Sequence, residues 1–277
     1  MKLAIAGKPL GFKGRFADCF NFLANLGLNA DEVQFVRGIW ATEKSAIEIK
    51  RNAEKAGIWL SVHAPYYVNL CSSKEKVVEN SIKFIKRTAE IGSKMGAHFV
   101  VFHSGYYGNL DEERAFQVVK EAIEKIITWM ESKGIEITIA PETMGSPKKF
   151  GSVDEMIRLK KELKSKLFLP TIDWAHIHAR CNGCLRKEKD FEEILKQLKK
   201  GIGSKELSRI HMHFTGVEYT LKGEKRHLPI DVKQFEELAK ALKKFNLKNT
   251  SIVCESPLLE KDALKMKKIL EAYGLYP

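Results

Sequence analysis

The sequence has few cysteines and no long apolar run. Five cysteines in 277 residues, with only Cys181 and Cys184 close together as a C-x-x-C pair, exclude a disulfide-dense scaffold. A zinc ribbon would need a second such pair. We therefore expect a local role for these two thiols, either free or joined in an occasional disulfide.

No segment approaches the apolar length that is needed to span a bilayer, so we expect no membrane anchor. The first residues read as a short strand followed by Gly-Lys-Pro-Leu-Gly, which suits a strand and its loop better than a signal peptide. The sequence therefore predicts a cytoplasmic protein. It also lacks a linker or low-complexity tract, and its length is typical of one α/β barrel, so we predict a single domain over residues 1–277.

Acidic residues are outnumbered by basic ones. Lysine and arginine total 47 against 35 aspartates and glutamates, a formal net charge of +12. Such an excess attracts polyanions and makes nucleic acid a plausible partner. Many of the lysines lie at helical spacing, as expected for solvated outer faces, so charge alone does not decide between these two interpretations.

Short apolar runs alternate with helical segments along the whole chain. The predicted strands cover residues 2–7, 31–36, 59–64, 98–104, 136–142, 167–173, 209–214 and 251–256. Of these, 31–36 has the weakest pattern. Amphipathic segments that end on glycine separate the strands, which is the arrangement of tandem βα units. Eight units in a chain of this size predict an α/β fold, specifically a closed (β/α)8 TIM barrel.

Potential metal ligands follow every predicted strand from the third onward. They are His63, His103, Glu142, Asp173, His211 with His213, and Glu255. In a closed parallel barrel the carboxyl ends of the strands converge at one mouth, so we expect these side chains to meet there. Unpaired buried carboxylates would be costly, which favours metal binding over a purely structural role.

Imidazole and carboxylate ligands without cysteine suit zinc, manganese, cobalt or iron(II), and more than four ligands indicate more than one ion. Glu142 lies in the middle of the series and has two oxygens to share between ions. Two such ions can activate water and stabilise a displacement at phosphorus. The chemistry expected from the residues is therefore hydrolysis of a phosphate ester.

In this order, the motifs H-A-P-Y, F-H-S-G, P-E-T, I-D-W-A-H, I-H-M-H and C-E-S resemble those of the endonuclease IV family, within the wider group of xylose-isomerase-like barrels. The resemblance covers residues 63–255. It implies a DNA repair hydrolase, an apurinic/apyrimidinic endonuclease of the deoxyribonuclease IV type. Such enzymes cut the phosphodiester 5′ to an abasic site in double-stranded DNA and leave a 3′-hydroxyl. They are usually monomers that hold three metal ions, most often zinc.

The resemblance also implies which residues bind the first two ions. His63 and His103 would hold the first ion, with Glu142 bridging to the second and serving as the catalytic residue. Asp173, His211 and Glu255 would complete the second ion. The neighbouring His213 lies on the same strand face as His211 and could take its place, although the register favours His211.

The third ion is where the chain departs from the family pattern. His176 and His227 match, but Lys225 stands where the family usually has aspartate. Either Glu224 supplies the missing carboxylate through a shifted loop, or the third ion is weak or absent. We favour Glu224.

Tyr66 matches a family tyrosine that lines the abasic-site pocket, where a ring could stack in the space left by the missing base. Lysine-bearing loops at 7–15, 144–151 and 220–227 follow three of the strands and could contact DNA phosphates. An ordinary rim aromatic and flexible loops are the alternative interpretations.

Two other functions compete with nuclease activity. A sugar isomerase or epimerase on the same barrel would use two carboxylates as acid and base beside one metal ion, and the additional histidines count against it. A DNA-binding barrel without catalysis is the other alternative. It is kept open only by the altered third site.

Overall fold

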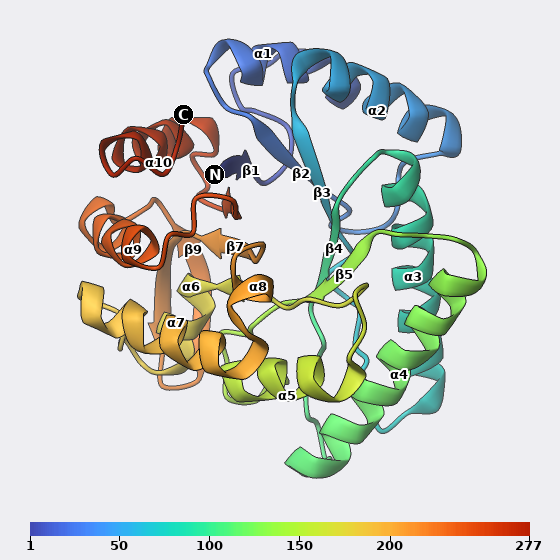
Figure 1. Cartoon of the computed structure of the whole chain (residues 1–277). Coiled ribbons are helices and arrows are strands. Elements are labelled where there is room, and N and C mark those ends of the chain that lie inside the picture. Colours follow the sequence, from blue (N-terminus) through green and yellow to red (C-terminus); the bar gives the residue numbers. More distant parts are fainter.

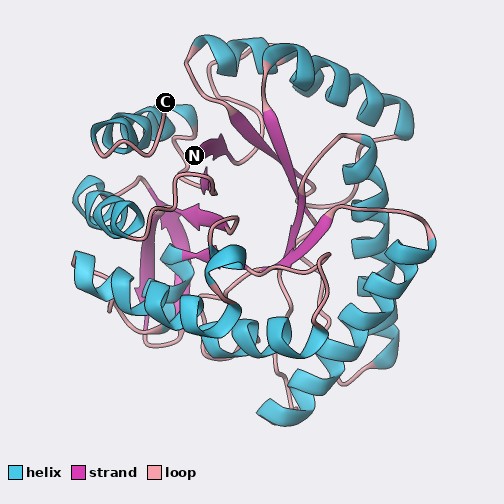
Figure 2. Cartoon of the chain, viewed as in Figure 1, coloured by secondary structure: helices cyan, strands magenta, loops and turns pink.

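A closed barrel of parallel strands forms the centre of the protein (Figures 1 and 2). The computed structural model describes residues 1–277. The barrel strands are β1 (Lys2–Ile5), β2 (Ala30–Gln34), β3 (Trp59–His63), β4 (Phe99–Phe102), β5 (Thr138–Pro141), β6 (Thr171–Asp173), β7 (His211–Phe214) and β10 (Ser251–Cys254). The eight-strand prediction is confirmed, including the weakest strand, at 31–36.

Two four-stranded sheets make up the barrel wall, in the orders β1-β10-β7-β6 and β2-β3-β4-β5. Parallel bridges join their edges, Ala6 with Glu32 on one side and Glu142 with Thr171 on the other. Strands from both ends of the chain therefore become neighbours, and every strand points its carboxyl end toward the same mouth.

Helices cover the outside of the barrel, as the cyan ring in Figure 2 shows. They are α1 (Phe20–Asn25), α2 (Glu43–Ala56), α3 (Glu75–Lys94), α4 (Glu112–Ser132), α5 (Val153–Leu163), α6 (Trp174–Arg180), α7 (Glu188–Ile202), α8 (Ser204–Leu207), α9 (Val232–Lys244) and α10 (Glu260–Ala272), with a short 3-10 turn at Phe16–Asp18. Helix starts are set locally. Thr42 and Ser152, for example, form capping boxes at α2 and α5. No helix is long and apolar enough to cross a membrane.

Successive side chains along each strand alternate between the core under the helices and the interior of the barrel. Residues such as Leu60, Val62, Val100 and Phe102 belong to the large apolar core that also takes in the helices. The intervening positions form small interior clusters inside the barrel, for example Phe99 with Val101, Ala140 and Leu169. Because side chains alternate between faces, a polar residue two positions beyond an interior residue also faces inward. This places the strand-end histidines and carboxylates inside the mouth.

Two local features differ from the expected loops. Residues 220–227 belong to an antiparallel hairpin of β8 (Gly216–Thr220) and β9 (Gly223–Leu228), which extends from the end of β7. Cys181 and Cys184, just after α6, form a disulfide, one of the two roles considered for them.

Candidate metal centre

The predicted ligands converge at the carboxyl ends of the strands, where they form adjacent groups, the first two of which share Glu142. Within each group the potential ligand atoms lie within 4.8 Å of one another. The groups are His63, His103 and Glu142; Glu142, Asp173, His213 and Glu255; and His176, Glu224 and His227.

The first group has Glu142 at its centre. The Nε2 atoms of His63 and His103 lie 3.4 and 3.3 Å from Glu142 Oε2. The Nδ1–H of His63 donates to the carbonyl of Ala64 over 2.8 Å, which leaves Nε2 with its lone pair facing the carboxylate. A histidine oriented in this way through its other nitrogen is prepared to bind a metal.

The second group has the other oxygen of Glu142 at its centre. His213 Nδ1 lies 3.4 Å from both Glu142 Oε1 and Glu255 Oε1. Asp173 Oδ1 caps α6 by accepting the N–H of His176 at 2.7 Å. The cap orients the carboxylate, so that Oδ2 remains available to the group.

On β7 the structure places His213, and not the expected His211, beside Asp173. Asp173 pairs with His213 in register, whereas His211 pairs with Thr171 and Ser251, one layer deeper in the barrel. His211 is therefore absent from the group formed by Asp173 and Glu255. The prediction placed His211 level with Asp173. In the structure, His211 lies two residues earlier on β7, on the same face of the strand but deeper in the barrel.

The third group lies between α6 and the β8–β9 hairpin. His176 Nε2 is 2.8 Å from Glu224 Oε2, and His227 Nε2 is 3.1 Å from Glu224 Oε1. The Nδ1–H groups of His176 and His227 have carbonyl acceptors in Thr143 and Glu255, at 2.8 and 3.1 Å. Both histidines are thus oriented with Nε2 toward the same carboxylate.

Glu224 occupies the position that the sequence left open, and Lys225 does not. Lys225 is exposed and pairs with Glu218 at 2.6 Å. Gly145 allows this approach, because a Cβ added there would lie 2.9 Å from both Glu224 and the His176 ring. The backbone N–H of Glu224 also donates to the Gly145 carbonyl over 2.9 Å.

Unpartnered buried atoms gather in the second group. Glu142 Oε1, Asp173 Oδ2 and His213 Nδ1 are buried and have no hydrogen-bond partner. Buried polar atoms are normally satisfied, and here three acceptors face one another. A divalent cation satisfies such a set, and imidazole and carboxylate donors are ligands that suit it. These clusters could therefore bind metal.

The pKa values of the metal-free ligands follow from this crowding. Burial raises the pKa of Asp173 to about 8, with Glu142 adding to the increase and His176 opposing it. Burial lowers the pKa of His227, but the hydrogen bond to Glu224 and the negative charges of Glu255, Asp173 and Glu224 together outweigh this effect, and the net pKa rises to about 9. In the metal-free protein, Asp173 and His227 therefore bind protons at the positions where a cation would bind.

Tyr66 stands at the rim of the first group. Its ring stacks on His103, with centroids 5.5 Å apart and planes 14° from parallel, and meets the His63 ring edge-on. Its hydroxyl donates to Gln34 at 3.3 Å. The side chain is nevertheless about half exposed, so one face of the ring is accessible from the mouth.

Lysines and arginines lie on the loops that follow the strands. Lys13, Arg37, Lys148 and Lys222 are exposed, while Arg226 pairs with Glu218. Arg37 adds the segment after β2 to the loops that were predicted to be basic.

Sequence reasoning missed Glu32. It is fully buried on β2 and lies with His211 and His213 in a further polar group. The signal was present in the alternation of Ala30, Glu32 and Gln34, which places Glu32 on the inner face. The adjacent Asp31 obscured this pattern, because two acids in succession read as the polar start of a strand.

The chain is similar in sequence to one barrel family and to several known proteins. The sequence model of a family described as xylose isomerase-like TIM barrel matches residues 20–273. An uncharacterized protein of Methanocaldococcus jannaschii is 36% identical, over 95% of this chain and 94% of that one. A probable endonuclease 4 of Mycoplasma mobile is 26% identical, over 80% of this chain and 78% of that one.

Solved structures share the fold at lower identity. Endonuclease IV from Thermus thermophilus superposes with a TM-score of 0.75 at 19% identity, covering 99% of this chain and 98% of that one. A D-tagatose 3-epimerase-like protein gives 0.73 at 21%, covering 99% and 97%. At these identities the likeness extends to the fold alone.

Proposed function

The chain belongs to the xylose isomerase-like TIM barrel family, and from this premise we propose that it is a metal-dependent DNA repair endonuclease. It would hydrolyse the phosphodiester 5′ to an abasic site in double-stranded DNA and leave a 3′-hydroxyl. The observation that carries the proposal is the succession of three ligand groups across one mouth, the first two joined by Glu142.

We propose that the ligand sets bind two or three divalent ions, which would be zinc, with manganese as another candidate. When bound, such ions would polarise phosphoryl oxygens and lower the pKa of a coordinated water. Glu142 directs its two oxygens into different groups, so we propose it as the bridging ligand and the catalytic residue. Glu224 completes the third group in this proposal.

The remaining residues would bind and orient the DNA. The exposed lysines on the strand-end loops would contact phosphates without reading bases, and the accessible face of Tyr66 would stack in the space left by a missing base. Because phosphate contacts release counterions, DNA affinity should fall steeply with salt. The relatives named as probable endonuclease 4 support this choice of substrate. We propose that the protein acts as a monomer in the cytoplasm.

Sugar epimerase activity is the second candidate, because one observation favours it. The second group alone contains two glutamates, an aspartate and a histidine, which suffices for one metal with a carboxylate acid and base. That interpretation leaves the first and third groups without a role. Variants His103→Ala and Glu224→Ala should therefore impair a nuclease and spare an epimerase.

The test uses purified protein with its metal content measured on the same sample. It is incubated with a duplex that carries one tetrahydrofuran abasic analogue, with the undamaged duplex as control and a ketose in a parallel reaction. We expect a single incision 5′ to the analogue. Intact duplex from metal-loaded protein together with turnover of the ketose would replace the nuclease proposal by the epimerase one.

A further inference from the structure

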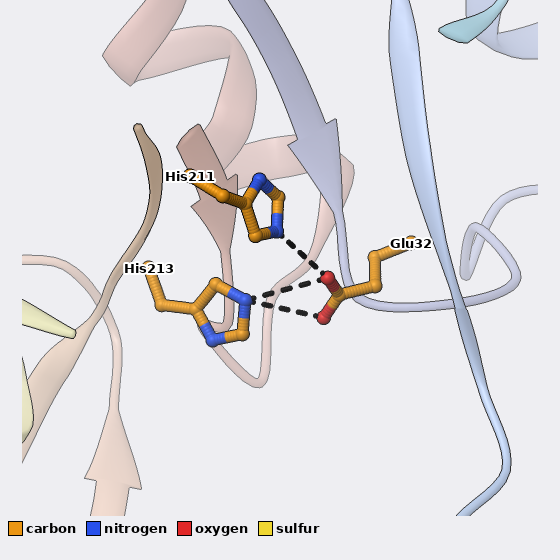
Figure 3. Close-up of side chains that lie close together, drawn as sticks. All are labelled: Glu32, His211 and His213. Carbon is orange, nitrogen blue, oxygen red and sulfur yellow. Dashed lines mark hydrogen bonds and ion pairs between the residues drawn. The ribbon is translucent and has the colours of Figure 1, made fainter. Parts of the chain in front are cut away.

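A further polar group, formed by Glu32, His211 and His213, lies directly beneath the ligand groups, inside the barrel. Figure 3 shows Glu32 facing His211 and His213, with all three side chains buried. His211 Nε2 lies 3.0 Å from Glu32 Oε2, and His213 Nε2 lies 3.3 Å from Glu32 Oε1. Taken by distance alone, the group resembles one more metal site.

The hydrogen bonds of Glu32 separate this group from the others. Its Oε2 accepts from the Ser61 hydroxyl at 2.8 Å, from His211 at 3.0 Å and from His213 at 3.4 Å. Its Oε1 accepts from the Gln34 amide at 3.0 Å and also lies 3.3 Å from His213 Nε2. The carboxylate thus has four donors in total, and each of its oxygens has at least one. Four donors match the acceptor capacity of one carboxylate, so the group is satisfied as a buried hydrogen-bond network without a cation.

His211 is satisfied in the same way. Because an ionised carboxylate only accepts hydrogen bonds, the Nε2 of His211 carries the proton, and its Nδ1 accepts from the Ser251 hydroxyl at 2.7 Å. The ring also stacks on Phe99, with centroids 5.1 Å apart and planes 13° from parallel. His211 therefore holds Glu32 from below and has no nitrogen free for a metal.

His213 is the member that reaches beyond the network. Its Nε2–H is directed to Glu32, so in the neutral ring Nδ1 carries the lone pair. Nδ1 is also the atom that lacks a hydrogen-bond partner while facing Glu142 and Glu255. We propose that Glu32 is a positioning residue that holds His213 in the Nε2–H tautomer, so that Nδ1 binds the divalent cation of the second group. The inference rests on the proposed function only in requiring that a cation binds there.

Two substitutions at position 32 distinguish positioning from simple packing. In Glu32→Gln the amide oxygen can still accept from His213, while the amide NH2 faces His211, which can change its tautomer and donate to Ser251 instead. In Glu32→Leu the volume is similar but the acceptor is lost. Ser251→Ala serves as the control, because it alters the network on the side of His211 away from His213.

The readout is binding of zinc alone, measured by chelator competition and by the number of ions retained, with circular dichroism to verify folding. Loss of an outer partner of a ligating histidine weakens metal binding by about 10- to 100-fold. We expect a loss of this size for one ion in Glu32→Leu, and at most a small change in Glu32→Gln and in Ser251→Ala. Wild-type affinity in folded Glu32→Leu would overturn the proposal.

A second measurement decides the case in which Glu32→Leu fails to fold. Nitrogen-15 NMR of the zinc-loaded wild-type protein reports the ligating nitrogen of each histidine. Ligation of His213 through Nδ1 is expected, and ligation through Nε2, or any zinc bound to His211, would refute the inference. Both readouts are independent of DNA cleavage, so a protein that binds zinc as described but leaves abasic DNA intact would refute only the proposed function.

Discussion

Asp173 at the end of β6 and His213 on β7 are direct partners in the parallel register, and both face the interior of the barrel mouth. Asp173 has two tasks there. One oxygen caps α6, and the other is directed at His176 and the second ligand group. A single carboxylate thereby ties the position of a helix start to the geometry of the site.

This dual role predicts different outcomes for two substitutions of Asp173. Asparagine retains an oxygen that caps α6 but loses the charge, so Asp173→Asn should fold normally and bind one ion more weakly. Asp173→Ala should additionally lose about 1 kcal/mol of stability with the cap. Metal content and urea denaturation of both variants test this. Equal stability of the two would mean that the cap contributes nothing.

Replacing Glu142 tests the proposed bridge. Glu142→Gln keeps the shape of the side chain and removes the charge that two groups share. Metal ions contribute several kcal/mol to the transition state, so activity on the abasic duplex should fall by about 1,000-fold or more. Incision rate and thermal melting measured side by side check this, and substantial residual activity in a folded variant would exclude the bridging role.

The third group can be removed without touching the other two. Glu224→Ala deletes its carboxylate, and Gly145→Ala places a methyl group against Glu224 and His176. Each variant should bind one ion fewer than the wild type. Lys225→Ala is the matched control, because that side chain is exposed and pairs with Glu218 outside the group. An ion count unchanged in all three variants would mean that no metal binds at Glu224.

Metal affinity should rise with pH. The pKa of Asp173 is raised to about 8 and that of His227 to about 9 in the metal-free protein, so both bind protons at pH 7. A cation has to displace them. Between pH 6 and 8 the affinity should therefore rise about tenfold per pH unit for each proton displaced. Calorimetry in two buffers of different ionisation enthalpy measures the protons released, and affinity independent of pH would contradict the assignment.

Tyr66 and Tyr67 provide a paired test of the rim. Tyr66 stacks on His103, whereas the similarly exposed Tyr67 contacts Phe84 edge-on. Removing a stacking ring costs about 1–3 kcal/mol per base, so Tyr66→Ala should weaken binding of the abasic duplex by about 5- to 150-fold. Tyr67→Ala should have little effect. Equal effects of the two substitutions would assign the ring of Tyr66 to general packing.

The choice between His211 and His213 depended on register alone. Both histidines lie on the inner face of the same strand, so alternation does not distinguish them. Only the hydrogen bonds that pair His213 with Asp173, and His211 with Thr171, settle which of them reaches the mouth. Sequence carries no direct record of how far one strand is shifted along its neighbour.

Glu32 and Glu224 also show which site residues the sequence can predict and which it cannot. Glu224 was foreseen as a substitute ligand because its neighbours matched a motif, and the β8–β9 hairpin then placed it beside His176. Glu32 has no motif around it, and its part in the site depends on contacts with His211, which lies 179 residues further along the chain.

The sequence by itself determined the alternation of strands and helices, the closed barrel, and the presence of potential metal ligands at successive strand ends. These follow from hydrophobic periodicity and residue chemistry, which are local properties of the chain. Only the tertiary structure decided which histidine joins Asp173, how the hairpin brings Glu224 into place, and that Glu32 lies beneath the site. Those outcomes depend on strand shift and on long-range packing, because a side chain's depth in a barrel is set by its neighbours and not by its own segment.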